Sequence, residues 1–555
     1  MRRVERWWRL GVLVALSAAG CGDSGPPVRI PPPVADAPEV VVGERLFLET
    51  RFAEYFFAHA GGQVNAPLNG GDPVLGTSET TGAPLPGPFA GRSMNCRACH
   101  LVDELGATVG GGVRTYADFA RRSPIPARED GARLTPRNSP ALVNASLPRA
   151  GAELFHFDGE FPSLEALVTG TLTGRNYGWL PAEHPIAIAH IAAVVRGDDG
   201  RDDIAAETGQ LPYRVLLAGT SPRIEPAYRL PAAYRIDVRQ ADDAAVVEAV
   251  SRLIAAYVRS LVFLQNSSGA FVNAPYDLFL RRNGLPRRAA PEESDRDYSR
   301  RLAAAVERLE APRWVTPRDA TFRFHRQPFQ FGPQELAGLR TFLAEAPRAG
   351  GGAGNCAACH PAPAFTDFRF HNTGVTQREY DAAHGPGAFA ALDVPDLTAR
   401  NADPAAYLPP SADYPAASGR FRAPASATRP GDTDLGAWNV LANPSMPAPQ
   451  EALTASLCDS VGLSAAACTP AALLPLTVAV FKTPGLRDLG QSGPYMHDGS
   501  LDAIEDVLDH YVAFAALARR GQVRNAAPEL ARIDLAPQDR APLAAFLRAL
   551  NEDYD

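Results

Sequence analysis

The clearest chemical signal in this sequence is a motif that occurs twice, in which two cysteines separated by two residues are followed directly by a histidine. The copies are Cys96-Arg97-Ala98-Cys99-His100 and Cys356-Ala357-Ala358-Cys359-His360. This pattern attaches haem c, because one turn of chain brings both thiols to the two vinyl groups of one porphyrin and lets the adjacent imidazole reach the iron. The motifs therefore predict two covalently bound haem c groups, with His100 and His360 as proximal iron ligands.

Two other chemistries also use closely spaced cysteines. Two such pairs would supply the four soft ligands of a zinc site. A thioredoxin-like redox pair opens a helix in a βαβ unit, and the sequence shows no such strands. The histidine that directly follows each pair, together with an export signal, favours haem attachment over both alternatives.

The other three cysteines have separate interpretations. Cys458 and Cys468 lie in a stretch rich in Ala and Ser, where a small disulfide suits an oxidising compartment. Cys21 follows Ser17-Ala18-Ala19-Gly20, and this stretch looks like a bacterial lipoprotein cleavage box in which Cys21 receives lipid and becomes the new N-terminus.

The first 20 residues carry the features of a signal peptide. Four arginines precede a short apolar stretch at residues 10–16, which is too short to span a bilayer. An ordinary secretory signal with an incidental cysteine is the alternative, and both readings place the mature protein outside the cytoplasm. We expect an exported lipoprotein at the periplasmic face of a bacterial membrane, held there by its N-terminal lipid through a Gly/Pro-rich tether.

Composition excludes one class of function. The 555 residues are 46% hydrophobic, which is enough for a folded protein of several domains. The formal net charge is −8 and no basic run stands out, so a nucleic-acid-binding groove lacks its electrostatic footprint.

Helical periodicity dominates the regular structure that the sequence predicts, and no strand pattern of comparable length appears. The predicted helices cover residues 246–264, 298–309, 333–344, 501–517 and 530–550. Gly/Pro-rich stretches at 61–91 and 393–448 are too long for plain connections, and we expect them to pack over the cofactors. The predicted fold is mainly α, with two cytochrome c-like haem domains and long Gly/Pro-rich loops.

The chain also repeats itself at an offset of 340 residues. Phe157-Asp158-Gly159 is matched by His497-Asp498-Gly499, and each triplet leads into an apolar helical stretch. The same offset matches Thr171 with Tyr511, so one domain offers an oxygen ligand that the other lacks. The predicted organisation is a signal peptide (1–20), a tether (21–43), an N-terminal haem domain with an insertion (44–245), a helical connecting region (246–332) and a C-terminal haem domain with an insertion (333–555).

Across most of residues 40–555 the pattern resembles the bacterial di-haem cytochrome c peroxidase and MauG family. The two haem motifs carry this resemblance together with residues 134–144 (LTPRNSPALVN) and, most specifically, residues 482–511 (KTPGLRDLGQSGPYMHDGSLDAIEDVLDHY). Residues 180–240 and 390–475 have no counterpart in the compact members of the family.

The resemblance implies that the C-terminal haem transfers electrons and is six-coordinate. Tyr511 stands where the family places the second axial ligand, which is Met in the peroxidases and Tyr in the MauG type. Tyrosinate ligation favours ferric iron and lowers the potential relative to Met. Met496 and His510 are the alternative ligands, and His497 is expected to form hydrogen bonds in the pocket.

The N-terminal haem resembles the peroxidatic centre of the family. No histidine lies between His100 and the Thr-Pro-Arg-Asn segment, which implies an iron open to peroxide, although His156 and Tyr116 are able to close it. Phe157 replaces the usual Trp between the haems, which argues against a hopping relay but not against tunnelling. Tyr177 falls where the family has an acidic residue that assists O–O cleavage, with Glu183 nearby.

The resemblance further implies a calcium ion between the domains. Asn138, Ser492 and Pro494 match the positions that hold it, and oxygen ligands suit this hard cation.

These expectations combine into one hypothesis. Hydrogen peroxide is reduced at the N-terminal haem, and the C-terminal haem relays electrons from a small donor protein of the cytochrome c or cupredoxin type. The alternative is an electron-transfer cytochrome, or a MauG-like oxidant of a protein partner, without peroxide turnover.

Overall fold

The structure, a computed structural model, describes residues 36–76, 91–100, 104–105, 113–114, 122–149, 151–322 and 325–553. The predicted signal peptide, Cys21 and Tyr116 lie outside these residues. Among the described helices, none combines the length and the apolar character that a membrane span requires.

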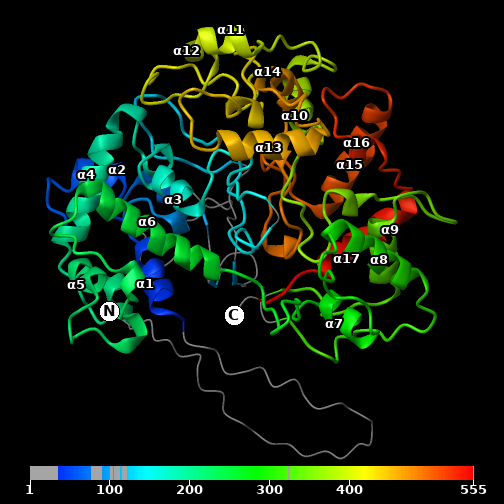
Figure 1. Ribbon diagram of the computed structural model, residues 1–555, viewed down its shortest axis with the longest axis horizontal. Coiled ribbons are helices and arrows are strands. Elements are labelled where there is room, and N and C mark those ends of the chain that lie inside the picture. Colours follow the sequence, from blue (N-terminus) through cyan, green and yellow to red (C-terminus); the bar gives the residue numbers. More distant parts are fainter. Residues whose placement is uncertain are drawn as a thin grey trace, which may run out of the picture. The chain divides into compact units, whose positions relative to one another are not determined.

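The prediction of a mainly α fold is confirmed (Figure 1). The helices of the first half are α1 (Pro38–Phe47), α2 (Glu54–His59), α3 (Leu164–Leu172), α4 (His184–Gly197), α5 (Tyr213–Ala218) and α6 (Asp243–Ser260). The following helices are α7 (Pro275–Arg282), α8 (Asp295–Glu307), α9 (Pro333–Leu343), α10 (Val375–His384), α11 (Leu397–Ala402), α12 (Pro404–Tyr407), α13 (Gln450–Val461), α14 (Pro470–Leu473), α15 (Ile504–Arg519), α16 (Pro528–Ala531) and α17 (Arg540–Arg548).

Sheet structure in the described residues is limited to two small antiparallel pairs. Strand β1 (Glu104–Leu105) pairs with β2 (Val113–Arg114), and β3 (Phe370–His371) pairs with β4 (Phe481–Lys482). The β3–β4 pair lies next to the second haem motif and fixes Lys482 opposite Phe370.

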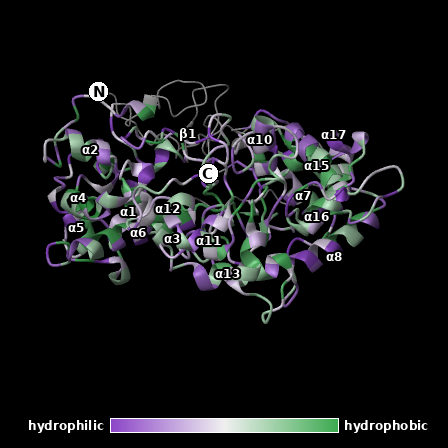
Figure 2. Cartoon of the chain, turned by 90° about the horizontal axis from the view of Figure 1, so that it is seen from above, coloured by the Kyte–Doolittle hydropathy of each residue, from purple (hydrophilic) through white to green (hydrophobic). Residues whose placement is uncertain are grey.

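The core of the first half forms around α6, which packs against α1, α3 and α4. Asp242 caps this helix by accepting a hydrogen bond from the backbone N–H of Ala245. Gly43 allows α1 to approach α6 closely, because a Cβ at this position would lie 2.1 Å from the carbonyl oxygen of Leu253 in α6. Helices in this half carry both hydrophobic and hydrophilic residues, as Figure 2 shows, which suits elements with one buried face.

A second core forms from α7, α8, α9 and α17. Gly338 allows α9 to approach α17 closely, because a Cβ at this position would lie 2.0 Å from the carbonyl oxygen of Pro542 in α17. The inserted segment 390–475 contributes a third cluster of buried residues that includes Phe421, Trp438 and Leu453. Its Gly/Pro-rich part is mostly irregular, with α11 and α12 as its helices.

Four of the five predicted helices match α6, α8, α9 and α15 within a few residues. The prediction of one helix over residues 530–550 is wrong, because the segment divides into α16 and α17. Pro537 disfavours helical backbone at the residue before it. The intervening backbone pairs with another segment instead, since Asp534 and Ala353 exchange two hydrogen bonds.

The internal repeat has a structural counterpart in two loops, each closed by an antiparallel bridge. The first bridge loop (residues 155–161) is closed by Phe155 and Phe161, and the second (residues 495–501) by Tyr495 and Leu501. Both loops adopt positive φ at their second and fifth residues. Those residues are His156 (62°), Gly159 (75°), Met496 (71°) and Gly499 (62°). The first loop leads into α3 and the second into α15, so the offset of 340 residues holds for backbone as well as sequence.

Candidate haem sites and the cavity beside the second motif

The two Cys-x-x-Cys-His motifs adopt the same local structure. Each begins with a single 3-10 turn, Cys96–Ala98 or Cys356–Ala358. The backbone N–H of the histidine donates to the carbonyl of the first cysteine, at 2.9 Å in the first motif and 2.8 Å in the second. One turn thus gathers two free thiols and an imidazole, which is the donor set that covalent haem attachment needs.

The orientation of His360 suits an iron ligand. Its Nδ1 lies 3.0 Å from the carbonyl oxygen of Phe365. A carbonyl accepts only from N–H, so this contact assigns the proton to Nδ1 and leaves the Nε2 lone pair available. Burial lowers the pKa of His360 and keeps the ring neutral, as metal binding requires.

An apolar cavity with a volume of about 240 Å³ adjoins the second motif. Cys356, Cys359 and His360 line the cavity, and Tyr511 and Met496 line it too. Two thiols and an imidazole in an otherwise apolar wall therefore fit the chemistry of a haem.

The cavity distinguishes between the candidates for the sixth iron ligand. Burial raises the pKa of the Tyr511 hydroxyl, which lies in the cavity wall. His510 is not among the lining residues, and its Nε2 lies 3.0 Å from the carbonyl oxygen of Thr373. Its ring stacks on Phe514, with 4.5 Å between ring centroids. The arrangement favours Tyr511 or Met496 over His510.

The three residues expected to hold calcium line the same cavity. Asn138 joins the two halves of the repeat, because its backbone N–H donates to the carbonyl of His497 at 2.7 Å and its Nδ2 to that of Pro494 at 2.5 Å. The Asn138 Oδ1 atom is buried and has no hydrogen-bond partner among the described residues. Ser492 also lines this cavity. An unpaired buried oxygen beside backbone carbonyls fits a hard cation.

Phe157 also reaches this cavity from the first bridge loop. Its ring lies 6.5 Å from the His497 ring, which in turn stacks on Phe481 at 3.6 Å. Lys482 lines the cavity as well and is partly buried, with its Nζ 2.7 Å from the carbonyl oxygen of Leu154. The pKa of Lys482 is lowered to about 7, first by burial and then by Arg149.

At the first motif, the structure places Tyr177 beside the first cysteine. The Tyr177 hydroxyl lies 3.0 Å from Cys96 Sγ. Burial raises the pKa of the Cys96 thiol to about 11 and that of Cys99 to about 12. Glu183 forms an ion pair with Arg128 at 2.8 Å. The catalytic roles of Tyr177 and Phe157 stay predictions.

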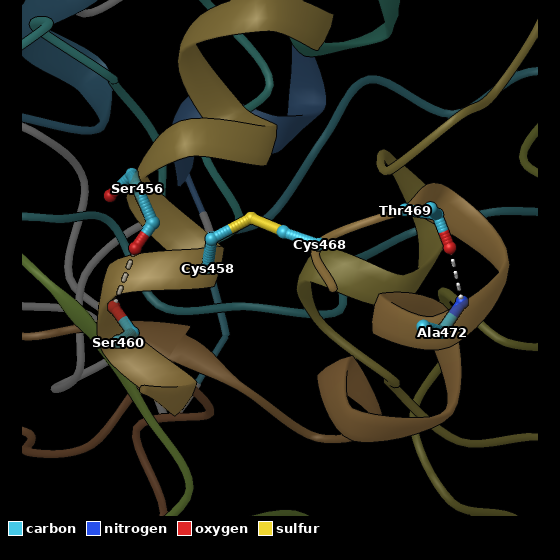
Figure 3. Close-up of a disulfide and its surroundings, with 6 residues drawn as sticks. All are labelled: Ser456, Cys458, Ser460, Cys468, Thr469 and Ala472. Carbon is cyan, nitrogen blue, oxygen red and sulfur yellow. Dashed lines mark hydrogen bonds between the residues drawn. A yellow bond between two sulfur atoms is a disulfide. The ribbon is translucent and has the colours of Figure 1, made fainter. Parts of the chain in front are cut away.

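Cys458 of α13 and Cys468, which precedes α14, are joined in a disulfide (Figure 3). Their Cα atoms are 5.9 Å apart. The bond closes a short loop within the inserted segment, away from both haem motifs in sequence.

Sequence reasoning missed a group of charged residues around the first bridge loop. Arg422 of the inserted segment forms ion pairs with Asp158 and Glu160 of that loop. Asp434 of the same segment forms an ion pair with Arg137. The sequence separations are 262 residues and more, so no local pattern signals these contacts.

Comparison with known proteins confirms the resemblance to the di-haem cytochrome c peroxidase and MauG family over a short segment. The chain is 42% identical over 74 residues to the methylamine utilization protein MauG of Methylorubrum extorquens, a segment that covers 13% of this chain and 19% of that one. It is 32% identical over 77 residues to the cytochrome-c peroxidase IdrP1 of Denitromonas iodatirespirans, covering 14% and 19%. The chain thus matches about a fifth of the length of these curated relatives. No family model matches it.

Two solved structures are similar along most of the chain. One is a MauG-like protein associated with microbial copper homeostasis, with 17% identity, a TM-score of 0.42 and 96% coverage of both chains. The other is the diheme peroxidase BthA of Burkholderia thailandensis, with 16% identity, a TM-score of 0.42 and coverage of 94% of this chain and 88% of that one. Similarity at this level does not establish a shared activity.

Proposed function

We propose that this chain is a di-haem c-type cytochrome with peroxidase-like activity. Hydrogen peroxide is reduced at the haem of the first motif, and the haem of the second motif relays electrons from an external cytochrome c or cupredoxin. The observation that carries this proposal is the pair of equivalent turns, each presenting two thiols and an imidazole, in a chain similar to MauG and cytochrome-c peroxidases.

The haems supply one-electron chemistry, and the residues of the chain give each haem its role. The contact with Phe365 fixes the ring of His360, and the apolar wall of the cavity would surround the second haem. Tyr511, or Met496 in its place, would be the second ligand of that iron, which would suit electron transfer rather than peroxide binding. Thr171 stands at the matching position of the first repeat, where it would not supply such a ligand.

Transfer between the haems would occur by tunnelling rather than by oxidation of Phe157, because a phenyl ring is much harder to oxidise than an indole. Phe157, His497 and Phe481 would lie beside the second haem, since all three line its cavity.

The decisive experiment has two parts on the purified full-length protein. A haem stain on a denaturing gel tests covalent attachment, and a variant in which Cys96, Cys99, Cys356 and Cys359 are all changed to Ala is the matched control. Peroxide turnover with a reduced small cytochrome or cupredoxin then tests activity. Stained protein with rapid turnover is the expected result, whereas unstained protein excludes the c-type assignment.

A second candidate function is electron transfer, or MauG-like oxidation of a protein partner, without peroxide turnover. Two features of the sequence favour it: Phe157 replaces the usual Trp, and Tyr177 falls where the family has an acidic residue. Rapid peroxide turnover with a reduced donor would exclude this alternative.

We further propose that the protein is exported and anchored by lipid at Cys21, on the periplasmic face of a bacterial membrane. The support is the sequence of residues 1–21 alone. Mass spectrometry of the mature N-terminus decides between lipidated Cys21 and an unmodified end, and a Cys21→Ser variant released into the soluble fraction would agree with the proposal.

A further inference from the structure

A second cavity lies in the inserted segment 390–475. Its volume is about 310 Å³, which is near the lower end of the range of roughly 300–1,000 Å³ for small-molecule sites. Tyr380 of α10 lines this cavity, and the other lining residues all belong to the inserted segment. Neither Cys-x-x-Cys-His motif contributes to its wall. The cavity is therefore separate from the haem sites and lies in a part of the chain without a counterpart in the compact relatives that the sequence resembles.

Arg420 is held in a fixed position in the wall of this cavity. The central carbon of its guanidinium lies 5.0 Å from the centroid of the Phe421 ring, and Nη2 donates to the carbonyl of Pro430 at 3.4 Å. Gly431 leaves room for the guanidinium, because a Cβ at this position would lie 1.7 Å from Arg420 Nη2. The backbone φ of Gly431 is 96°, which also favours glycine. The cation is thus positioned by the chain itself.

The positive charge of Arg420 has no carboxylate partner among the described residues. Two other arginines of the inserted segment do have one, since Arg422 pairs with Glu160 and Arg429 with Asp432. Arg420 makes only the contact with the Pro430 carbonyl and the contact with the Phe421 ring. A guanidinium offers five N–H donors in a planar fork that matches a carboxylate. The cavity therefore presents donors that suit an anion.

Tyr380 supplies a second polar group that lacks a partner. Its side chain lines the cavity and the residue is only 5% exposed. The ring is packed against Phe389, with 5.9 Å between ring centroids. Within the described ranges, the Tyr380 hydroxyl has no hydrogen-bond partner. Because hydroxyls of buried residues are nearly always paired, this group also indicates a site for a polar ligand atom.

The remaining wall limits the kind of anion that the cavity accepts. Leu392, Pro395 and Tyr407 provide apolar surface, and the Tyr407 ring lies parallel to Phe421 at 6.1 Å between centroids. An apolar ligand body would pack against them. Asp393 adds one carboxylate to the wall, and this charge repels a ligand with a second negative group. The wall thus favours a monoanion with an apolar body over a dianion.

We propose that this cavity binds a small monocarboxylate with a compact apolar body. The ligand carboxylate pairs with the Arg420 guanidinium, and the Tyr380 hydroxyl bonds to the same ligand. This inference is independent of the proposed function, because the cavity shares no residue with the haem motifs and binding requires no peroxide chemistry.

The test uses isothermal titration calorimetry on the full-length haem-loaded protein. The probes are benzoate, benzyl alcohol and phthalate, which carry one carboxylate, none and two on the same ring. The visible absorption of the haems is recorded in parallel, since a carboxylate that binds a haem iron would change that spectrum.

Four variants test the named contacts. Arg420→Gln removes the charge, and Arg420→Lys keeps the charge without the planar fork. Tyr380→Phe removes only the hydroxyl, and Asp393→Asn removes the negative charge of the wall. Arg429→Gln is the matched control, because Arg429 lies in the same segment with 71% of its side chain exposed and does not line the cavity.

The expected result is saturable benzoate binding that is tighter than binding of either other probe. Arg420→Gln weakens it by about 10–100-fold, as loss of a hydrogen-bonded charge pair predicts, and Arg420→Lys falls between. Tyr380→Phe weakens it by about 2–10-fold. Asp393→Asn reduces the preference for benzoate over phthalate. The control binds benzoate like the parent protein, and the haem spectrum does not change.

Three outcomes would overturn the inference, and none of them affects the proposed function, which peroxide turnover tests. The first is a parent protein without saturable benzoate binding. The second is benzyl alcohol binding as tightly as benzoate, which would make the site apolar only. The third is benzoate binding that shifts the haem spectrum and is unchanged in Arg420→Gln, which would place the carboxylate on a haem iron. If Arg420→Gln fails to fold, unchanged benzoate binding in Tyr380→Phe together with unchanged probe preference in Asp393→Asn overturns the inference.

Discussion

Glu49 gives the sharpest quantitative prediction, because its carboxylate is buried among donors beside the first core. It accepts hydrogen bonds from Arg51 Nη2 at 2.6 Å, from Arg51 Nε at 2.8 Å and from the Tyr213 hydroxyl at 2.9 Å. Burial raises its pKa, but the charge and hydrogen bonds of Arg51 outweigh this and lower the pKa from 4.5 to about 2. The neighbouring Leu48 carbonyl accepts from Asn95 Nδ2, so this anchor also supports the first haem motif.

The magnitude follows from linkage between ionisation and folding. A folded pKa below the unfolded one stabilises the protein above the unfolded pKa, and the contribution is lost as pH falls toward the folded value. With about 1.36 kcal/mol per pH unit, Glu49 contributes roughly 3 kcal/mol at pH 7 and about half of that at pH 3. Glu49→Gln should therefore destabilise the protein by that larger amount at pH 7 and by about half as much at pH 3.

Urea unfolding followed by circular dichroism at both pH values measures this difference, provided that the slope with urea is unchanged. Glu165→Gln is the control, since Glu165 pairs with Arg259 at the surface, where such pairs contribute about 0–1 kcal/mol. An equal loss at pH 7 and pH 3 in Glu49→Gln would refute the electrostatic explanation and leave only a packing defect.

Three further predictions concern the haem and cation sites and the inserted segment. Tyr511→Phe removes the proposed oxygen ligand, so the second haem should change from low-spin to high-spin in the ferric electron paramagnetic resonance spectrum; an unchanged spectrum would point to Met496. Reduction of the Cys458–Cys468 disulfide, which closes a 10-residue separation, should cost roughly 3 kcal/mol of unfolding free energy measured by urea titration, and a Cys458→Ser variant should be insensitive to reductant. Chelation of calcium should lower the melting temperature of the parent protein but not that of Asn138→Ala, whereas equal shifts in the two would show that this residue holds no ion.

The residues that chemistry constrains most tightly were predictable from the sequence. Covalent attachment to one porphyrin dictates the spacing of Cys96, Cys99 and His100, so the motif is visible without any structure. The repeat is visible for a similar reason, since the bridge loops need a Gly at a left-handed position and keep Asp beside it. Amphipathic helices such as α6 follow from their apolar period.

Contacts between distant parts of the chain were not predictable. Nothing in the sequence of residues 390–475 indicates that Arg422 reaches Glu160, because a surface arginine and a buried one look alike in sequence. Asn138 and Pro494, which are 356 residues apart, were brought together only by the resemblance to a known family and not by any pattern in the sequence itself. The break between α16 and α17 was not predicted because apolar residues keep their helical spacing past Pro537. This spacing masks the effect of Pro537, which disfavours helical backbone at the residue before it.

Lys482 is the only lysine in the chain, since every other basic side chain among Lys and Arg is arginine. A reagent that acylates primary amines therefore finds one side-chain target, and that target stands in the wall of the cavity beside the second motif. With a pKa near 7, its amine is largely in the nucleophilic form at mildly alkaline pH. The chain thus carries a single-site chemical reporter, whose labelling rate before and after haem loading registers cofactor occupancy in the native protein without any introduced residue.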